Sequence, residues 1–266
     1  MPPTLDLLQQ SRSTLTNNDW RILSNVIHAY DAFSSIPYAC QVSEQLSRLE
    51  ISGRSVGSTT LEMVGRSILS MRSLISSLPD FQILTTAEQI SLLERNWYAI
   101  SGLNYILIAR DSSLIENLRY LRDSGDKLYR ADVVAGMIGI KKRIDPDSTL
   151  IKIILVILAF SSNCLVLNVP RSRKNDSFLF GTFRLFGSQN VFVEILWKYM
   201  VYRYGHEESV IRFARLVMEM LNVINQAAAA YSSTDAHRSI MEQAFEQNDQ
   251  WLSAIAKTPV PLWGNR

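Results

Sequence analysis

The chain contains 266 residues, 47% of them hydrophobic and 20% charged, a balance that fits a globular protein with a large core and excludes a disordered one. Its 11 glycines and 8 prolines are too few for an all-β fold with many tight turns, and its net charge of +2 is too small for nucleic-acid binding by bulk electrostatics. Cys40 and Cys164 lack the clustered spacing of zinc ligands. The sequence therefore predicts reduced core or near-core thiols of an intracellular protein, no zinc-based DNA-binding module and no direct DNA binding by this chain.

The first predicted helix begins at a polar cap formed by Thr16 and Asp19 and continues to about Phe33. Its apolar residues recur at helical spacing, and these are Trp20, Leu23, Ile27 and Tyr30. Residues 34–57 mix serine, glycine and proline with short apolar patches, which predicts a flexible linker with one helical turn at most. A long helix is expected from about Ser58 to Ser77.

The next segment joins the end of that helix to the start of another. Pro79 lacks an N–H group and restricts the residue before it, so the preceding helix ends there. Thr85 and Glu88 have the spacing of a capping box, in which each side chain satisfies a free backbone donor at a helix start. The sequence therefore predicts a helix from about residue 87 to 109, with Ile90, Leu93 and Trp97 on its buried face.

The middle of the chain contains the only predicted β-structure. Turn-forming residues 123–126 lie between short apolar runs, which indicates a small β-hairpin over residues 120–129. A short helix is expected from Asp132 to Ile140. Asp145 followed by Pro146 predicts the cap and first residue of a buried helix that ends near Cys164. This helix carries the most apolar run of the chain, which is shorter than the ~20 residues that cross a bilayer, so no membrane association is expected.

The last third of the chain is predicted to contain two long helices. They span about Phe186–Tyr204 and Glu207–Ala230, on either side of Gly205. The apolar positions expected to be buried are Val193, Leu196, Trp197 and Met200 in the first helix, and Phe213, Val217, Met220, Leu221 and Ile224 in the second. Residues 235–256 look weakly helical, and the prolines in 257–266 predict an irregular tail. Helices with short connections and no break in composition predict one all-α domain over residues 1–266.

One string in this pattern resembles the signature of nuclear receptor ligand-binding domains. It reads Phe81-x-x-Leu84-x-x-x-Glu88-Gln89-x-x-Leu92-Leu93-x-x-x-Trp97. Residues 15–30, 148–163 and 199–216 are also similar to successive helices of that family, so the resemblance covers about residues 15–230 in the family's order. It implies a three-layer antiparallel helical sandwich with a cavity for a lipophilic small molecule. It also implies a groove for a coregulator helix, dimerisation with itself or another nuclear receptor, and a role in transcription regulation in the nucleus, with the cytoplasm as a second location.

The resemblance places one group of residues around the implied steroid-like or other lipophilic ligand. They are Met63, Val64, Ser67, Trp97, Tyr98, Ser101 and Tyr105. A preformed apolar pocket with a few polar anchors suits such a ligand. An aromatic stripe at helical spacing is more often plain core, and both interpretations stay open. Ile108 stands where some members of the family carry an arginine for an acidic ligand, so an acid is not expected.

The implied coregulator groove comprises Ser76, Gln89, Ile90, Leu93 and Glu94. The family binds the two ends of a guest helix with opposite charges. Ser76 replaces the basic residue, Glu94 reverses a second basic position, and nothing after residue 251 matches the amphipathic activation helix. We therefore expect non-standard coregulator binding, or ordinary helix packing by the apolar members of the groove.

The implied dimer interface comprises Arg212, Arg215, Leu216, Glu219, Met220 and Val223. An apolar stripe with flanking charges suits a symmetric helix pair, although its apolar half could equally seal the core. His28, His206 and His237 have no metal-ligand spacing, so we expect no enzyme, no metal and no cofactor. Three hypotheses remain, namely a ligand-responsive receptor domain, a ligand-independent dimerisation or corepressor scaffold without the activation helix, and an unrelated helical domain.

Overall fold

The structure is a computed structural model that describes residues 15–48, 53–117, 120, 129–161 and 182–233, together with residues 235, 238–240, 242, 243 and 246. Every regular element within these ranges is a helix, and they contain no strand, which confirms the predicted all-α fold. The predicted hairpin lies outside the described residues, apart from the helical Tyr120 and from Tyr129. The predicted tail, 257–266, lies outside them as well.

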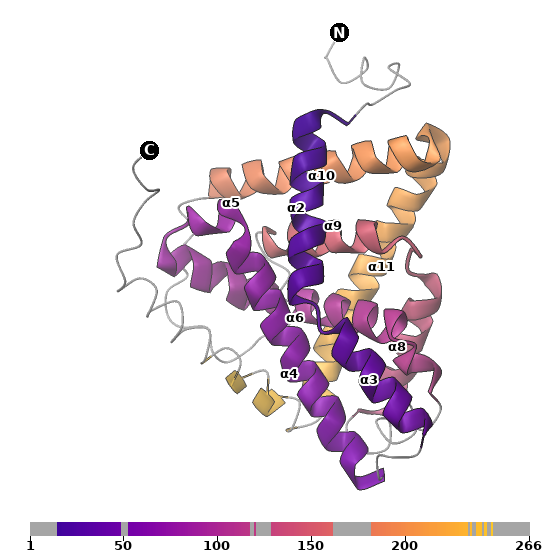
Figure 1. Ribbon diagram of the computed structural model, residues 1–266. Coiled ribbons are helices and arrows are strands. Elements are labelled where there is room, and N and C mark those ends of the chain that lie inside the picture. The colour runs from indigo at the N-terminus through magenta and orange to yellow at the C-terminus, as the bar shows by residue number, and fades with distance from the viewer. Residues whose placement is uncertain are drawn as a thin grey trace.

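The helices follow one another in the order α2 (Asn17–Phe33), α3 (Ile36–Ser47), α4 (Gly53–Ser77), α5 (Pro79–Gln82), α6 (Thr86–Asp111), the 3-10 helix η1 (Leu114–Glu116), α8 (Ala131–Arg143), α9 (Ser148–Ala159), α10 (Thr182–Tyr204) and α11 (His206–Ser233). Helix α6 contacts α4, α9 and α11, while α9 also contacts α2 and α10. In Figure 1, α2 and α4 lie in front, and α10 crosses behind α2. Helix α6 is therefore the element around which most of the others pack.

Two capping boxes fix the starts of α2 and α6 as the sequence predicts. The backbone N–H of Asp19 donates to Thr16 Oγ1 over 3.2 Å, and the N–H of Thr16 donates back to the Asp19 carboxylate over 2.9 Å. Thr85 and Glu88 repeat this exchange at α6, with distances of 3.3 and 2.9 Å. These interactions need only four consecutive residues, which explains why the sequence alone locates them.

Helix α3 occupies half of residues 34–57, for which the sequence favours a flexible linker, and α4 begins at Gly53 within the same segment. Pro37 stands in its first turn, where the missing N–H costs nothing. Ala39, Val42 and Leu46 recur at helical spacing and are buried against α6 and η1. Burial of this short stripe stabilises a helix that the serine-rich composition of the segment does not predict. Cys40 lies on the opposite face and is exposed, which corrects the expectation of a core thiol.

The start of α9 also differs from the prediction by two residues. Asp147 caps the helix, since its Oδ1 accepts from the N–H of Thr149 over 2.9 Å. Asp145 accepts from the N–H of Asp147 over the same distance and belongs to the preceding turn. Two aspartates that flank Pro146 both suit a cap, and only the second has its partner in the helix. The helix ends at Ala159, and Cys164 lies outside the described residues.

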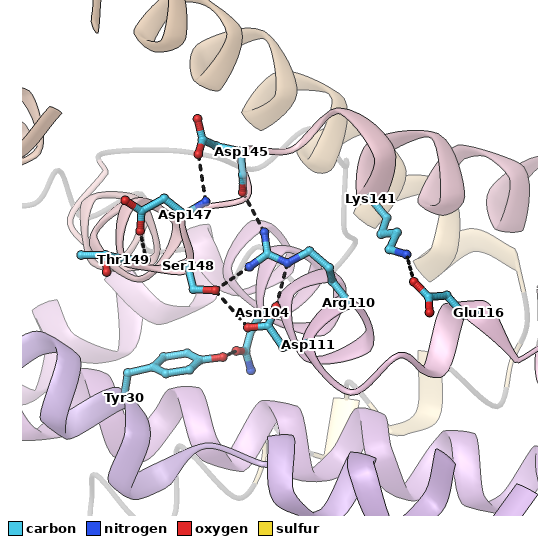
Figure 2. Close-up of polar contacts among 10 residues, drawn as sticks. All are labelled: Tyr30, Asn104, Arg110, Asp111, Glu116, Lys141, Asp145, Asp147, Ser148 and Thr149. Carbon is cyan, nitrogen blue, oxygen red and sulfur yellow. Dashed lines mark hydrogen bonds and ion pairs between the residues drawn. The ribbon is translucent and has the colours of Figure 1, made fainter. Parts of the chain in front are cut away.

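Buried asparagines tie α6 to its neighbours. Asn104 Nδ2 donates to the backbone carbonyl of Ser67 and to the hydroxyls of Ser67 and Ser70, over 3.1, 2.8 and 3.2 Å. Its Oδ1 accepts from the hydroxyl of Tyr30 over 2.9 Å (Figure 2). Asn96 Nδ2 donates to the carbonyls of Ala159 and Ser161 at the end of α9. Each carboxamide is fully buried and hydrogen-bonded, the arrangement that makes a buried polar group stabilising.

The C-terminal end of α6 is held by Arg110, which joins it to the turn before α9 (Figure 2). Its guanidinium donates to the carbonyl of Asp145 over 2.7 Å and to the hydroxyl of Ser148 over 2.6 Å, and pairs with Asp111 over 2.7 Å. On the far side of the same turn, Asp145 Oδ2 pairs with Arg212 of α11 over 2.8 Å. This network fixes α6, α9 and α11 relative to one another.

Candidate functional site

A cavity of about 50 Å³ lies between α4, α6, α8 and α11. Its walls include Val64, Ser67, Tyr98, Ser101 and Tyr105, all of which the resemblance places around a ligand. The other residues that line it are Ile68, Gly102, Ile106, Tyr129, Met137, Val223, Gln226, Ala227 and Ala230. The lining is largely apolar, with a few polar side chains among it, which is typical of sites for lipophilic molecules.

Two of the predicted ligand residues do not line this cavity. Trp97 is fully buried in the main core around α6, and Met63 packs in a separate cluster with Ala39 and Leu46 of α3. Tyr98, Ser101 and Tyr105 are three and four residues apart and share one face of α6. Trp97 lies one residue off that face, about 100° around the helix.

The close crossing of α6 and α11 forms one end of the cavity. A Cβ at Gly102 would lie 2.9 Å from the Cβ of Ala227 and 3.7 Å from Val223, so glycine is what allows this approach. The α11 residues of the lining are absent from the ligand positions that the sequence predicts. Val223, Ala227 and Ala230 do recur at helical spacing, but this spacing identifies cavity residues only once Gly102 of α6 is known to face Val223 and Ala227.

Two polar atoms of the lining are buried and have no hydrogen-bond partner among the described residues. They are the hydroxyl oxygen of Ser101, a residue only 8% exposed, and Oε1 of Gln226. The hydroxyl of Ser67 differs, because it accepts from Asn104 Nδ2. No charged side chain lines the cavity within the part of the chain that the structure describes. The site therefore suits a neutral molecule.

A tyrosine cluster separates this cavity from a second one of about 10 Å³. The hydroxyls of Tyr105 and Tyr120 are in contact, and Tyr105, Tyr129 and Met137 line both cavities. Burial, reinforced by the neighbouring phenols, raises the pKa of Tyr105 well above its ordinary value and raises that of Tyr129 too. Both phenols are therefore neutral at physiological pH.

The residues of the predicted coregulator groove lie where α4, α5 and α6 meet. Leu93 is buried in the main core, and Ile90 packs partly buried against it. Gln89 Nε2 donates to the carbonyl of Phe81 over 2.9 Å, which holds α5 against α6. Ser76 and Glu94 are half-buried. Leu93 and Gln89 thus hold the helices together, as in ordinary helix packing. The chain beyond residue 246, where the family's activation helix would follow, lies outside the described residues.

The predicted dimer residues on α11 divide between the core and the surface. Leu216, Glu219, Met220 and Val223 are buried, and Glu219 pairs with Arg143 over 2.7 Å. Arg212 is occupied by its pairs with Asp145 and Glu208 and by the ring of Tyr204, and Arg215 is exposed.

The exposed apolar side chains of α11 lie on another face of the helix. These residues, named here the α11 stripe, are Val210, Ile211, Val217, Met218 and Leu221, which are 47–59% exposed. The sequence predicts Val217 and Leu221 as core positions, and the structure corrects this. Both sit in a helix that is apolar nearly all round, so periodicity alone does not say which side faces the core.

Among the described residues, no group of three or more His, Cys, Asp or Glu side chains could hold a metal ion. His28 is exposed, and His206 lies partly buried with its ring edge-on to Trp197, at 5.8 Å between centroids. His237 is outside the described residues. No helix in the described part of the chain is long and apolar enough to cross a membrane.

No family model matches the chain, and no curated protein matches it.

Proposed function

We propose that this chain is a nuclear-receptor-type ligand-binding domain that regulates transcription, takes a small lipophilic molecule into the cavity between α4, α6, α8 and α11, and dimerises. The observation that carries the proposal is the cavity itself. It lies beside the α6 face that carries Tyr98, Ser101 and Tyr105, which the resemblance places around a ligand.

The packing of the helices supports the proposed three-layer arrangement. Helices α2 and α4 contact each other and pack on α9 and α6, respectively. Helices α10 and α11 also contact each other and pack on α9 and α6 in turn. A middle layer of α6 and α9 between the α2–α4 and α10–α11 pairs accounts for all of these contacts, as in the sandwich that the resemblance implies.

The volume of the cavity limits the size of the ligand. About 50 Å³ accommodates a few waters and is a third of the ~150 Å³ void that takes up benzene in an engineered protein. A sterol-sized molecule would need far more room. Met137 is the side chain best able to provide extra space, because methionine is flexible and this one stands between the two cavities. The expected ligand is accordingly small, at most a single ring, which fits once the Met137 side chain has moved aside.

Binding of small neutral probes tests this proposal. Toluene and phenol should each bind saturably and raise the melting temperature by about 2 °C or more at ten times the dissociation constant, since such occupancy adds about 1.4 kcal/mol of stability. The variant Met137→Ala should bind both more tightly, because it widens the cavity. The matched control Met218→Ala removes the same side chain from a position that is 59% exposed and should bind like the parent.

Absence of saturable binding by both probes, in the parent and in Met137→Ala, would contradict the proposal. The regulatory part is tested by tethering the chain to a reporter promoter through a separate DNA-binding module. Reporter output should differ from that of the module alone. Output equal to that of the module alone, with and without the bound probe, would contradict a role in transcription.

A second candidate function is that of a ligand-independent dimerisation scaffold, and the α11 stripe favours it. Large apolar side chains gathered on one helix face commonly mark an interface. We expect the purified chain to self-associate through this face, and Val217→Glu to convert it to a monomer in sedimentation velocity. The matched control Val191→Glu, on α10 and 44% exposed, should leave the association unchanged. A monomeric parent at high micromolar concentration would rule out self-association through the α11 stripe.

A further inference from the structure

The cavity contains a feature that its apolar lining does not explain, a glycine in the middle of a neighbouring helix. Gly136 stands in the sixth position of the 13-residue helix α8, where glycine costs about 0.5–1 kcal/mol relative to alanine. A Cβ at this position would lie 2.0 Å from Nε2 and 2.6 Å from Oε1 of Gln226. The absence of a side chain at Gly136 therefore makes the space in which the Gln226 carboxamide lies.

This carboxamide belongs to the lining of the cavity. Gln226 lines the cavity, and its buried Oε1 has no hydrogen-bond partner among the described residues. The Ser101 hydroxyl lines the same cavity from α6, is more than nine-tenths buried, and also lacks a partner in the part of the chain that the structure describes. A buried polar atom without a partner costs about 1–3 kcal/mol. Two such atoms on one cavity are positioned to form hydrogen bonds with a bound molecule.

We infer that Ser101 and Gln226 together recognise a single hydroxyl group, so that the ligand of this cavity is a small, neutral, apolar alcohol or phenol. A hydroxyl can donate one hydrogen bond and accept others, so it can donate to Gln226 Oε1 and accept from the Ser101 hydroxyl at the same time. A carboxylate is excluded as the matching group, because no cation lines the cavity within the described residues and Gln226 Oε1 would repel it. This inference rests on the proposed function and names the chemistry of the ligand.

The preference for a hydroxyl is measured by comparing phenol with toluene, which have the same number of heavy atoms and differ in a hydroxyl or a methyl group. The measured quantity is the preference for phenol, namely the dissociation constant of toluene divided by that of phenol. Two hydrogen bonds of about 1 kcal/mol each should make this ratio about 25-fold larger in the parent than in the double variant Ser101→Ala/Gln226→Leu. In each single variant the ratio should be about fivefold smaller than in the parent, because one of the two hydrogen bonds is lost.

Gly136→Ala provides a variant in which both polar residues remain. Its methyl group displaces the flexible end of Gln226, so the ratio should fall about fivefold, as in Gln226→Leu, while the helix stays folded by circular dichroism. Gly65→Ala is the matched control. It lies in α4, where an added Cβ meets nothing within 4 Å, and should keep the parental ratio.

The outcomes separate this inference from the function on which it rests. If both probes bind but the ratio is the same in the parent, Ser101→Ala and Gln226→Leu, the cavity takes apolar molecules and the hydroxyl inference is wrong. If neither probe binds the parent or Met137→Ala, the proposed ligand-binding function is wrong as well. A ratio that falls in the polar variants and in Gly136→Ala, but not in Gly65→Ala, supports the inference.

Discussion

Buried polar side chains on the face of α6 toward α2, α4 and α9 are hydrogen-bonded, whereas one on the face toward α11 has no partner among the described residues. Toward α2 and α4, Asn104 makes four hydrogen bonds, and toward α9, Asn96 donates to the carbonyls of Ala159 and Ser161. Toward α11, the Ser101 hydroxyl is buried without a partner among the described residues, beside a cavity. A satisfied buried group stabilises the fold, whereas an unsatisfied one costs stability and has to be explained by something else. The first face is structural, and the second is the candidate site.

The largest effect that follows from this comparison is expected at Asn104. Truncation in Asn104→Ala leaves the Tyr30 hydroxyl and two serine hydroxyls without their shared partner in the core. The free energy of unfolding, measured by urea titration, should fall by about 3 kcal/mol, at the upper end of the cost of stranded buried polar groups plus the lost packing. A loss below about 1 kcal/mol would show that the Asn104 network is not structural.

The next largest effect is expected where α6 crosses α11. In Gly102→Ala, the new Cβ stands 2.9 Å from the Cβ of Ala227, so the helices must move apart at a cost of about 1–3 kcal/mol. Ala227→Gly removes the opposing methyl, and the double variant should regain most of the loss in a double-mutant cycle. Additive effects of the two substitutions would mean that the helices do not touch at this point.

The sequence predicts the starts of α2 and α6 better than it predicts the site. A capping box is a local interaction, and so Thr16–Asp19 and Thr85–Glu88 can be read without knowing the rest of the fold. The three α6 residues of the lining, Tyr98, Ser101 and Tyr105, are also local in sequence, and helical spacing together with the resemblance places them on one face. Gln226 and Gly136 cannot be found like this, because their contact joins two helices that are 90 residues apart in the chain.

The prediction for α11 shows a second limit of sequence patterns. Apolar residues occur on nearly every side of this helix, so a stripe can be drawn along several directions. Leu216 and Val223 turn out to face the core, while Val217 and Leu221 are about half exposed. Which stripe is buried is decided by Gly102 and the other residues that α11 packs against, and these lie far away in the sequence.

A smaller, pH-dependent effect is expected at the cap of α9. Burial alone would raise the pKa of Asp147, but hydrogen bonds from Tyr204, from the N–H of Thr149 and from Tyr199 hold it below its usual value. A carboxyl group whose pKa is lowered in the folded state contributes its stability above the unfolded-state pKa of about 3.9. That contribution is lost as the pH falls from there through the folded-state pKa.

Tyr204→Phe should therefore cost about 1 kcal/mol in unfolding free energy at pH 7, the discounted value of one hydrogen bond to a half-buried carboxylate. The difference from the parent should shrink as the pH falls from about 4 through the lowered pKa of folded Asp147, where its carboxyl becomes neutral. Tyr202→Phe is the control, since that side chain is 62% exposed on the same helix. A Tyr204→Phe cost that stays constant down to pH 2 would place the effect in packing and not in the charge.

The smallest effect has the opposite sign and tests the unsatisfied face of α6. Ser101→Ala removes a buried hydroxyl that has no partner among the described residues and introduces a better helix former, so the unliganded protein should gain about 0.5–1 kcal/mol. The same substitution should weaken the preference for phenol over toluene about fivefold. A residue that lowers the stability of the fold while improving the binding of one class of molecule is expected at a binding site and not in plain core. If Ser101→Ala instead destabilises the unliganded protein as Asn104→Ala does, both faces of α6 are structural and the contrast between them disappears.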